Sequence, residues 1–132
     1  MKSADPVREF LVRRGCAEHV VEGGLERLVA NWERCVADIG RGYYGYLDNY
    51  LNDLDGRQIL HELGAAILLP GPMMRRLVKA DEEFVRLTLP VAGCLWGEKI
   101  REKFRWSASS NPWYFREPRE PGPDLRKDLA ER

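Results

Sequence analysis

The stretch LERLVANWERCVADI, residues 25–39, decides the fold, because its apolar residues recur at the spacing of one helical face. Leu, Val, Trp, Cys and Ile lie on that face, and Glu, Arg and Asp fill the positions between them. Gly40 and Gly42 follow and end the pattern. We therefore predict a central core helix over this stretch, in which Cys35 acts as a small hydrophobic side chain.

The residues before the central helix predict two shorter helices. Asp5 and Pro6 mark the start of the first helix, and Gly15 marks its end. A second short helix is expected over about residues 17–22, closed by the glycine pair at 23–24.

The segment 43–62 combines tyrosines, acidic residues and one arginine, and it predicts a helix, a break and a second helix. Apolar residues recur at helical spacing on both sides of the break. Asp53 or Asp55 is expected to cap the second helix, since capping is the ordinary use of aspartate at such a position. Arg57 is expected to pair with Asp48, Asp53 or Asp55 as a clasp across the break, or alternatively to hold an anion.

Beyond residue 69 the pattern changes several times. The tripeptide PGP at 70–72 is a hard break from which a further helix starts, and Asp81 interrupts the apolar stripe of that helix. Residues 98–106 fit both a strand and a helix, so their periodicity leaves the two alternatives open. The aromatic residues of PWYF, 112–115, are expected in an extended strip laid over the helices.

The predicted fold is predominantly all-α: a compact bundle of four to six helices with an extended, aromatic-rich carboxy-terminal segment packed over it. A length of 132 residues with 44% hydrophobic residues is enough for one core. Residues 1–115 form the expected single helical domain. Residues 116–132 form an expected proline- and charge-rich tail, with one frayed turn at 124–130.

The composition of the chain argues against several classes of protein. Lys plus Arg and Asp plus Glu number 21 each, so the net charge is zero and the usual basis for a nucleic-acid or anionic-membrane partner is missing. The longest apolar run, 65–69, is far too short to span a membrane, and residues 1–10 lack the apolar core of a signal peptide. Three cysteines at wide spacings do not suggest disulfides. We expect a cytoplasmic protein with no membrane partner.

No segment matches a catalytic or metal-binding template, so we expect no catalytic residue, no metal and no cofactor. Aligned on a calcium loop through Gly56, the sequence places Leu51 at the first ligand position, where an oxygen ligand is required. The pair His61-Glu62 lacks the second histidine of a zinc-protease motif, since Ala65 stands in its place. The histidines and cysteines are too scattered for a zinc site or a nucleophile with its base.

The tyrosines at the start of the segment 43–62 divide into two pairs. Tyr43 and Tyr50 fit the apolar face of the predicted helix, whereas Tyr44 and Tyr46 point elsewhere. The aromatic strip at 112–115 can pack over this helix, or the two clusters can bind something else.

The leading functional prediction is a non-catalytic protein-protein interaction or regulatory module, which binds another protein or a second copy of itself. Surplus tyrosine, tryptophan and arginine near a surface are typical of binding hot spots. The alternative is a small-molecule-binding domain or modest enzyme, with a pocket between residues 43–62 and 96–115. A weak nucleic-acid binder through residues 99–106, where basic and aromatic side chains alternate, is the third possibility. The predicted binding residues are Tyr46, Tyr50, Asp53, Asp55, Arg57, Trp96 and Trp113.

Overall fold

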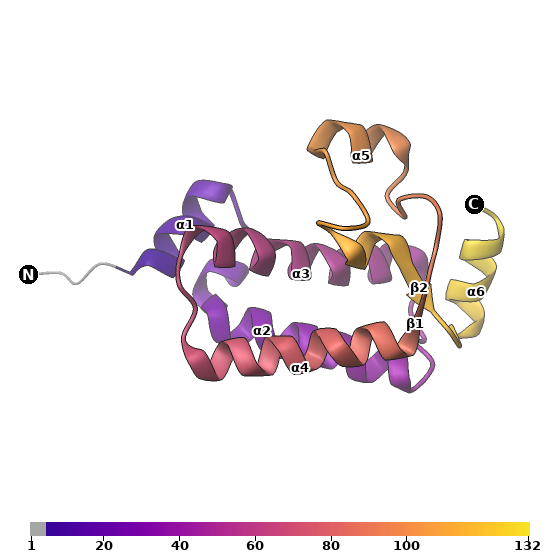
Figure 1. Cartoon of the computed structure of the whole chain (residues 1–132), viewed down its shortest axis with the longest axis horizontal. Coiled ribbons are helices and arrows are strands. Elements are labelled where there is room, and N and C mark those ends of the chain that lie inside the picture. The colour runs from indigo at the N-terminus through magenta and orange to yellow at the C-terminus, as the bar shows by residue number, and fades with distance from the viewer. Residues whose placement is uncertain (1–4) are drawn as a thin grey trace, which may run out of the picture.

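Three long helices form the body of the protein in the computed structural model, which describes residues 5–132 (Figure 1). Helix α2 packs against both α3 and α4, and the shorter elements lie around these three. The predominantly helical fold predicted from the sequence is confirmed. The elements in chain order are α1 (Pro6–Arg14), α2 (Glu18–Gly40), α3 (Leu47–Ala66), α4 (Gly71–Leu87), β1 (Thr88–Pro90), α5 (Glu98–Phe104), η1 (Pro112–Phe115), β2 (Arg116–Pro118) and α6 (Pro123–Ala130).

The amino-terminal helices follow the signals in the sequence. Asp5 Oδ1 accepts a hydrogen bond from the backbone N–H of Arg8 at 3.1 Å, and Gly15 ends α1 in the left-handed conformation with φ 85°. The short helix and the central helix run together as α2, with a kink at Gly24, where φ is 64°. The kink sets the first residues of α2 at an angle to the rest (Figure 1).

The apolar face of α2 lies at the centre of the core. Trp32 is 2% exposed, and its ring packs on Phe84 of α4 with the centroids 5.0 Å apart. Cys35 is 1% exposed, as its place in the apolar stripe predicts. Burial raises the pKa of its thiol above the ordinary range, so this cysteine stays protonated and acts as a packing group.

Helix α3 is continuous, so the predicted break inside it is wrong. Asp53 and Asp55 lie within the helix, and neither caps a helix end. Gly56 lowers helix stability by about 1 kcal/mol relative to alanine, but burial of one face carries the helix through this position. The residues of that buried face are Tyr50, Leu51, Leu54, Arg57, Gln58, Leu60 and Leu63.

The chain returns across the bundle through a pair of short strands. β1 and β2 are antiparallel, with Thr88 opposite Pro118 at one end and Pro90 opposite Arg116 at the other. The buried Thr88 hydroxyl donates to the backbone oxygen of Phe84 at 2.7 Å and accepts from Arg116 Nε at 2.8 Å. These bonds tie the carboxy-terminal segment to the end of α4.

The carboxy-terminal aromatic region differs in part from its prediction. Residues 98–104 are the helix α5, which decides between the two alternatives left open by the sequence. The PWYF segment is the 3₁₀ helix η1, so the expected extended conformation is wrong there. The prediction that its aromatic residues pack over the helix of segment 43–62 is confirmed. The 3₁₀ helix η1 lies against α3, and Trp113, Tyr114 and Phe115 are buried.

The last part of the chain is more ordered than the frayed turn predicted for it. It forms β2 and the complete helix α6, and Leu125 of α6 is fully buried. Asp128 Oδ2 accepts the backbone N–H of Leu47 at 3.0 Å, so α6 supplies a side-chain acceptor for the start of α3. No helix within residues 5–132 is long and apolar enough to cross a bilayer.

Candidate functional site

Arg57 does not form the predicted clasp with Asp48, Asp53 or Asp55; it pairs with Asp81 of α4. Arg57 Nε donates to Asp81 Oδ1 at 2.9 Å, and Arg57 Nη2 donates to Asp81 Oδ2 at 2.8 Å. The same Oδ1 accepts Trp32 Nε1 at 2.8 Å. The acidic residue that interrupts the stripe of α4 therefore joins three helices, and Arg57 is a structural residue.

Trp113, one of the predicted binding residues, is instead a core residue, 5% exposed. The guanidinium of Arg57 lies over its ring, with Cζ 4.4 Å from the centroid, and the buried Nη1 has no hydrogen-bond partner among the described residues. Trp113 Nε1 donates to Gln58 Oε1 at 3.2 Å, and Asn111 Nδ2 donates to the same oxygen at 2.9 Å. These contacts hold η1 on α3.

The burial of the tyrosines is as the sequence predicts, but Tyr43 lies in the loop before α3 and not on the helix, so that part of the prediction is wrong. Tyr43 and Tyr50 are buried, with their rings edge to face at 5.3 Å, while Tyr44 and Tyr46 are 74% and 57% exposed. Tyr43 donates its hydroxyl to Asp53 Oδ2 at 2.6 Å. Burial raises the pKa of Asp53, against the opposing effects of the Tyr43 hydrogen bond and the positive charge of Arg34. Tyr46 and Tyr50 line neither of the two clefts described below.

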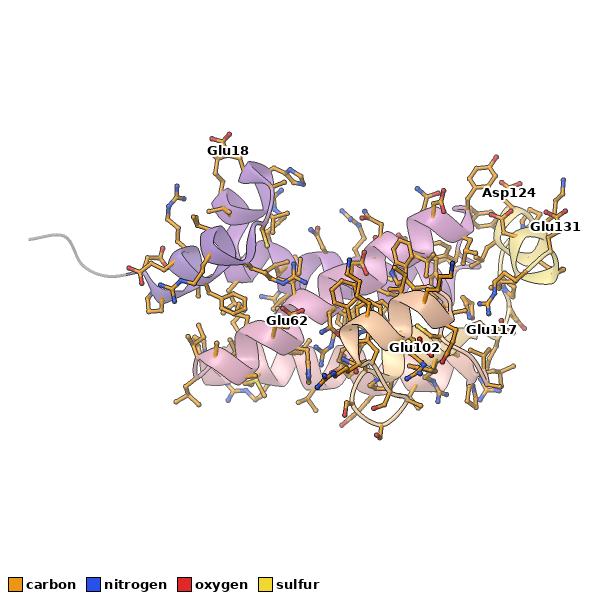
Figure 2. The ribbon with its side chains drawn as sticks, turned by 90° about the horizontal axis from the view of Figure 1, so that it is seen from above. Glu18, Glu62, Glu102, Glu117, Asp124 and Glu131 are labelled. Carbon is orange, nitrogen blue, oxygen red and sulfur yellow. The ribbon has the colours of Figure 1, made fainter. Side chains whose placement is uncertain are left out.

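A cleft of about 540 Å³ lies between α3 and the segment that carries α5, and we call it the aromatic cleft. Figure 1 shows α5 standing apart from the bundle on two connecting segments. In Figure 2, Glu62 of α3 lies between the amino-terminal corner, where Glu18 is labelled, and α5, where Glu102 is labelled. The aromatic cleft is lined by Arg14, Asp55, Ile59, Glu62, Trp96, Ile100, Phe104, Trp106 and Tyr114.

A stack of three rings builds one wall of the aromatic cleft. Trp106 stacks on Tyr114 with a centroid distance of 4.0 Å and on Phe104 with a distance of 5.1 Å. Tyr114 is buried at the base of the stack, and Phe104 at its outer end is 53% exposed. The stack joins η1 to α5 and fixes where α5 lies above α3.

Asp55 connects α3 to this wall through two hydrogen bonds. Its Oδ1 accepts Trp96 Nε1 at 3.0 Å and the Tyr114 hydroxyl at 2.6 Å. Burial and the bond to Asp55 raise the pKa of Tyr114, which keeps the hydroxyl a donor. Asp55 Oδ2 accepts no hydrogen bond from the described residues and is the open acceptor of the aromatic cleft.

An ion pair lines another part of the aromatic cleft. Arg14 Nε and Nη2 donate to the two carboxylate oxygens of Glu62 at 2.8 and 3.0 Å, and Gln58 Nε2 donates to Glu62 Oε2 at 3.1 Å. Burial opposes ionisation of Glu62, but the bonds from Arg14 and Gln58 outweigh it and lower its pKa. Glu62 therefore stays charged and paired.

A second cleft, of about 450 Å³, lies between α2 and α3, and we call it the polar cleft. It shares Asp55 and Ile59 with the aromatic cleft, so the two clefts meet along this part of α3. The residues that line it are Ala17, His19, Val20, Arg27, Leu28, Asn31, Trp32, Arg34, Asn52, Asp53, Asp55, Gly56 and Ile59.

The two clefts include only part of the predicted binding set. Asp55 and Trp96 line the aromatic cleft, and Asp53 lines the polar cleft with Asp55. Sequence reasoning missed Arg14 and Ile100, because nothing in a single sequence indicates that α1 and α5 approach the same part of α3. One sequence signal did indicate part of this site. It is the alternation of basic and aromatic residues at 99–106, since Phe104 and Trp106 of this segment line the aromatic cleft.

Of the four basic residues in the segment 99–106, only Arg101 forms an ion pair among the described residues. Arg101 pairs with Glu98, Nη2 to Oε1, at 2.6 Å. Lys103 Nζ lies 5.4 Å from the centroid of the Phe104 ring, and Trp106 stacks on its neighbours. The segment forms a wall of the aromatic cleft.

No three His, Cys, Asp or Glu side chains in the described part of the chain converge as ligands for a metal ion. Comparison of the chain with protein-family models, with curated proteins and with solved structures finds no match.

Proposed function

We propose that the protein is a cytoplasmic binding domain that holds a small ligand with a flat hydrophobic body in the aromatic cleft. The exposed apolar wall of this cleft carries the proposal, since Trp96 is 38% and Phe104 53% exposed. Removing apolar surface from water contributes about 25 cal/mol per Å², so a ligand lying against these rings is favoured. A volume of about 540 Å³ also suits a small molecule, for which sites of roughly 300–1,000 Å³ are typical.

The polar groups of the aromatic cleft support binding more than catalysis. Asp55 is held by two donors, and Glu62 by Arg14 and Gln58. A general base needs a free group with a pKa near the working pH, whereas the pKa of Glu62 is lowered. These side chains are better placed to orient a ligand than to move protons.

Binding of 2-naphthol, a neutral aromatic probe, tests this proposal. We expect it to shift the indole N–H signals of Trp96 and Trp106 in ¹H–¹⁵N NMR spectra, while that of Trp32, which is bonded to Asp81 in the core, stays in place. Ile100→Asp places a charge in the apolar wall and is expected to weaken binding about tenfold or more. No residue of α5 is buried, so this variant should fold normally.

The matched control is Val78→Asp, which adds the same charge at a 47% exposed apolar position on α4. It should bind 2-naphthol as the unmodified protein does. If 2-naphthol causes no shift at millimolar concentration, or if both variants bind it equally well, the aromatic cleft is not a ligand site.

A stripe of exposed apolar residues favours self-association as a second candidate function. Met74, Val78 and Val85 lie on one side of α4, separated by four and seven residues, and Leu89 follows in β1; each is between 40% and 49% exposed. Such spacing lets two identical helices pack against each other across a two-fold axis. The occupant proposed for this stripe is therefore a second copy of the chain.

Light scattering over a dilution series tests self-association. We expect the mass to rise toward that of a dimer with concentration, and Val78→Asp to keep the protein monomeric. Ile100→Asp should leave the dimer unchanged, since it lies on α5. A constant monomer mass up to millimolar concentration would exclude this second function.

A further inference from the structure

The polar cleft contains four formal charges, two of each sign, and none of them belongs to an ion pair among the described residues. Arg27 and Arg34 contribute from α2, and Asp53 and Asp55 contribute from α3. Six other arginines in the described part of the chain do pair closely with acids, for example Arg14 with Glu62. The walls of this cleft therefore hold balanced charge that is not neutralised by close contact within the cleft.

The two carboxylates of the polar cleft have phenol partners in place of cationic ones. Tyr43 donates to Asp53 at 2.6 Å, and Tyr114 donates to Asp55 at 2.6 Å. A phenol supplies a hydrogen bond but no positive charge, so each aspartate still attracts a cation. Burial raises the pKa of Asp53, and the Tyr43 hydrogen bond and the positive charge of Arg34 do not fully offset this effect.

The two arginines are equally open. Neither Arg27 nor Arg34 donates a side-chain hydrogen bond to any described residue, and both are exposed at the cleft. They are seven residues apart on α2, with Asn31 between them, so all three lie on one side of the helix. Guanidinium groups are well suited to bind a carboxylate through paired hydrogen bonds.

Nothing in the packing of α3 requires a glycine at position 56. A Cβ atom built there meets no atom within 4 Å, and its φ is not in the left-handed region. Glycine inside a helix is unfavourable relative to alanine, so a glycine without a steric or conformational reason points to another use. Its place in the lining of the polar cleft supplies one: it leaves space beside Asp55.

We propose that the ligand of the aromatic cleft is a zwitterion, an aromatic molecule that carries an ammonium group beside a carboxylate, as an aromatic α-amino acid does. The ring lies in the aromatic cleft, and the head group lies in the polar cleft across the shared residues Asp55 and Ile59. The ammonium group donates to Asp55 and is attracted by Asp53. The carboxylate accepts from Arg27 and Arg34. This inference rests on the proposed function, since it names the ligand class of the same site.

A series of four naphthyl probes tests the head group by calorimetry. The probes are 3-(2-naphthyl)-L-alanine with both charges, 3-(2-naphthyl)propionate without the ammonium, 2-(2-naphthyl)ethylamine without the carboxylate, and 2-naphthol without either. We expect the zwitterion to bind about tenfold or more tightly than each singly charged probe, because each charge adds charge-assisted hydrogen bonds.

Variants assign each charge to its partner. The double variant Arg27→Gln, Arg34→Gln is expected to lower the affinity for the two probes with a carboxylate about tenfold. Its affinity for the ethylamine should be unchanged. Asp55→Asn should weaken the two probes with an ammonium by a similar factor. Gly56→Ala should fold and melt at a higher temperature, yet bind the zwitterion less tightly and 2-naphthol as before. Arg75→Gln, at an exposed arginine of α4 that forms no described ion pair, is the control for lost charge.

The pattern of probe binding tests the zwitterionic ligand and the aromatic cleft separately. Equal binding of all four probes would overturn the zwitterion and leave the aromatic cleft as a ligand site. Equal affinity of the propionate and the zwitterion would show that only an anion is recognised, which also overturns it. Failure of every probe to bind would overturn the aromatic cleft itself.

Discussion

Asp81→Ala is expected to lower the free energy of unfolding by about 3 kcal/mol and the melting temperature by roughly 10 °C. The substitution removes both acceptors of Arg57, whose side chain is 10% exposed, and the acceptor of Trp32 Nε1. Arg57 would then keep a buried positive charge with only the Trp113 ring against it, which is a large uncompensated cost. Denaturant and thermal unfolding followed by circular dichroism measure the change.

Two further variants identify the cause of that loss. Removing both charges in Arg57→Leu, Asp81→Leu should recover a large part of the stability, because a buried ion pair replaced by apolar groups is close to neutral. Asp38→Ala breaks an exposed pair with Arg41 and should change stability by under about 1 kcal/mol. If Asp81→Ala were as mild as Asp38→Ala, the Arg57 pair would not stabilise the three-helix junction.

Gly122→Ala is expected to cost about 2 kcal/mol, although its φ of −65° suits any residue. A Cβ atom there would lie 2.6 Å from the backbone oxygen of Tyr43 and 2.8 Å from that of Gly42. Both contacts are with backbone, so α6 or the loop before α3 must move. The backbone N–H of Gly122 also donates to Tyr43 O at 3.2 Å, and that bond would be strained. Thermal unfolding measures the loss.

Gly93→Ala is the matched control, since a Cβ atom there meets nothing within 4 Å and the φ of Gly93 is not positive. It should leave the melting temperature unchanged within about 2 °C. Equal melting temperatures for the two variants would mean that the contact between Gly122 and Tyr43 carries no stability.

The helices that stabilise themselves locally could be predicted from the sequence. Asp5 and Gly15 bracket α1, and the apolar stripe of residues 25–39 fixes the central helix, because caps and periodicity act within a few residues. The break predicted in α3 fails for the opposite reason. Aspartates beside Gly56 are typical of a helix start, but contacts with distant segments bury the helix on both sides of that position.

Contacts between residues far apart in the chain could not be predicted from the sequence alone. From the sequence, Asp81 was seen only as an interruption of the apolar face of a helix. Its partner Arg57 lies 24 residues earlier, and no local pattern indicates the pair. Gly122 read as part of a loose tail, because its contact with Tyr43 depends on how α6 returns to α3. The general region of the aromatic cleft could be foreseen from clustered aromatic residues, but which of them face it depends on the position of α5.

The exposure of helix α5 offers a way to detect a ligand in the aromatic cleft. None of its residues is buried, and Gly97 and Arg105 at its ends have positive φ values of 97° and 57°. No residue of α5 belongs to the hydrophobic core, so its amide protons should exchange with solvent through local opening while the α2–α3–α4 body stays intact. A ligand in the aromatic cleft would have to order this segment, and slower hydrogen exchange at residues 99–104 would report its binding even where no spectroscopic signal changes.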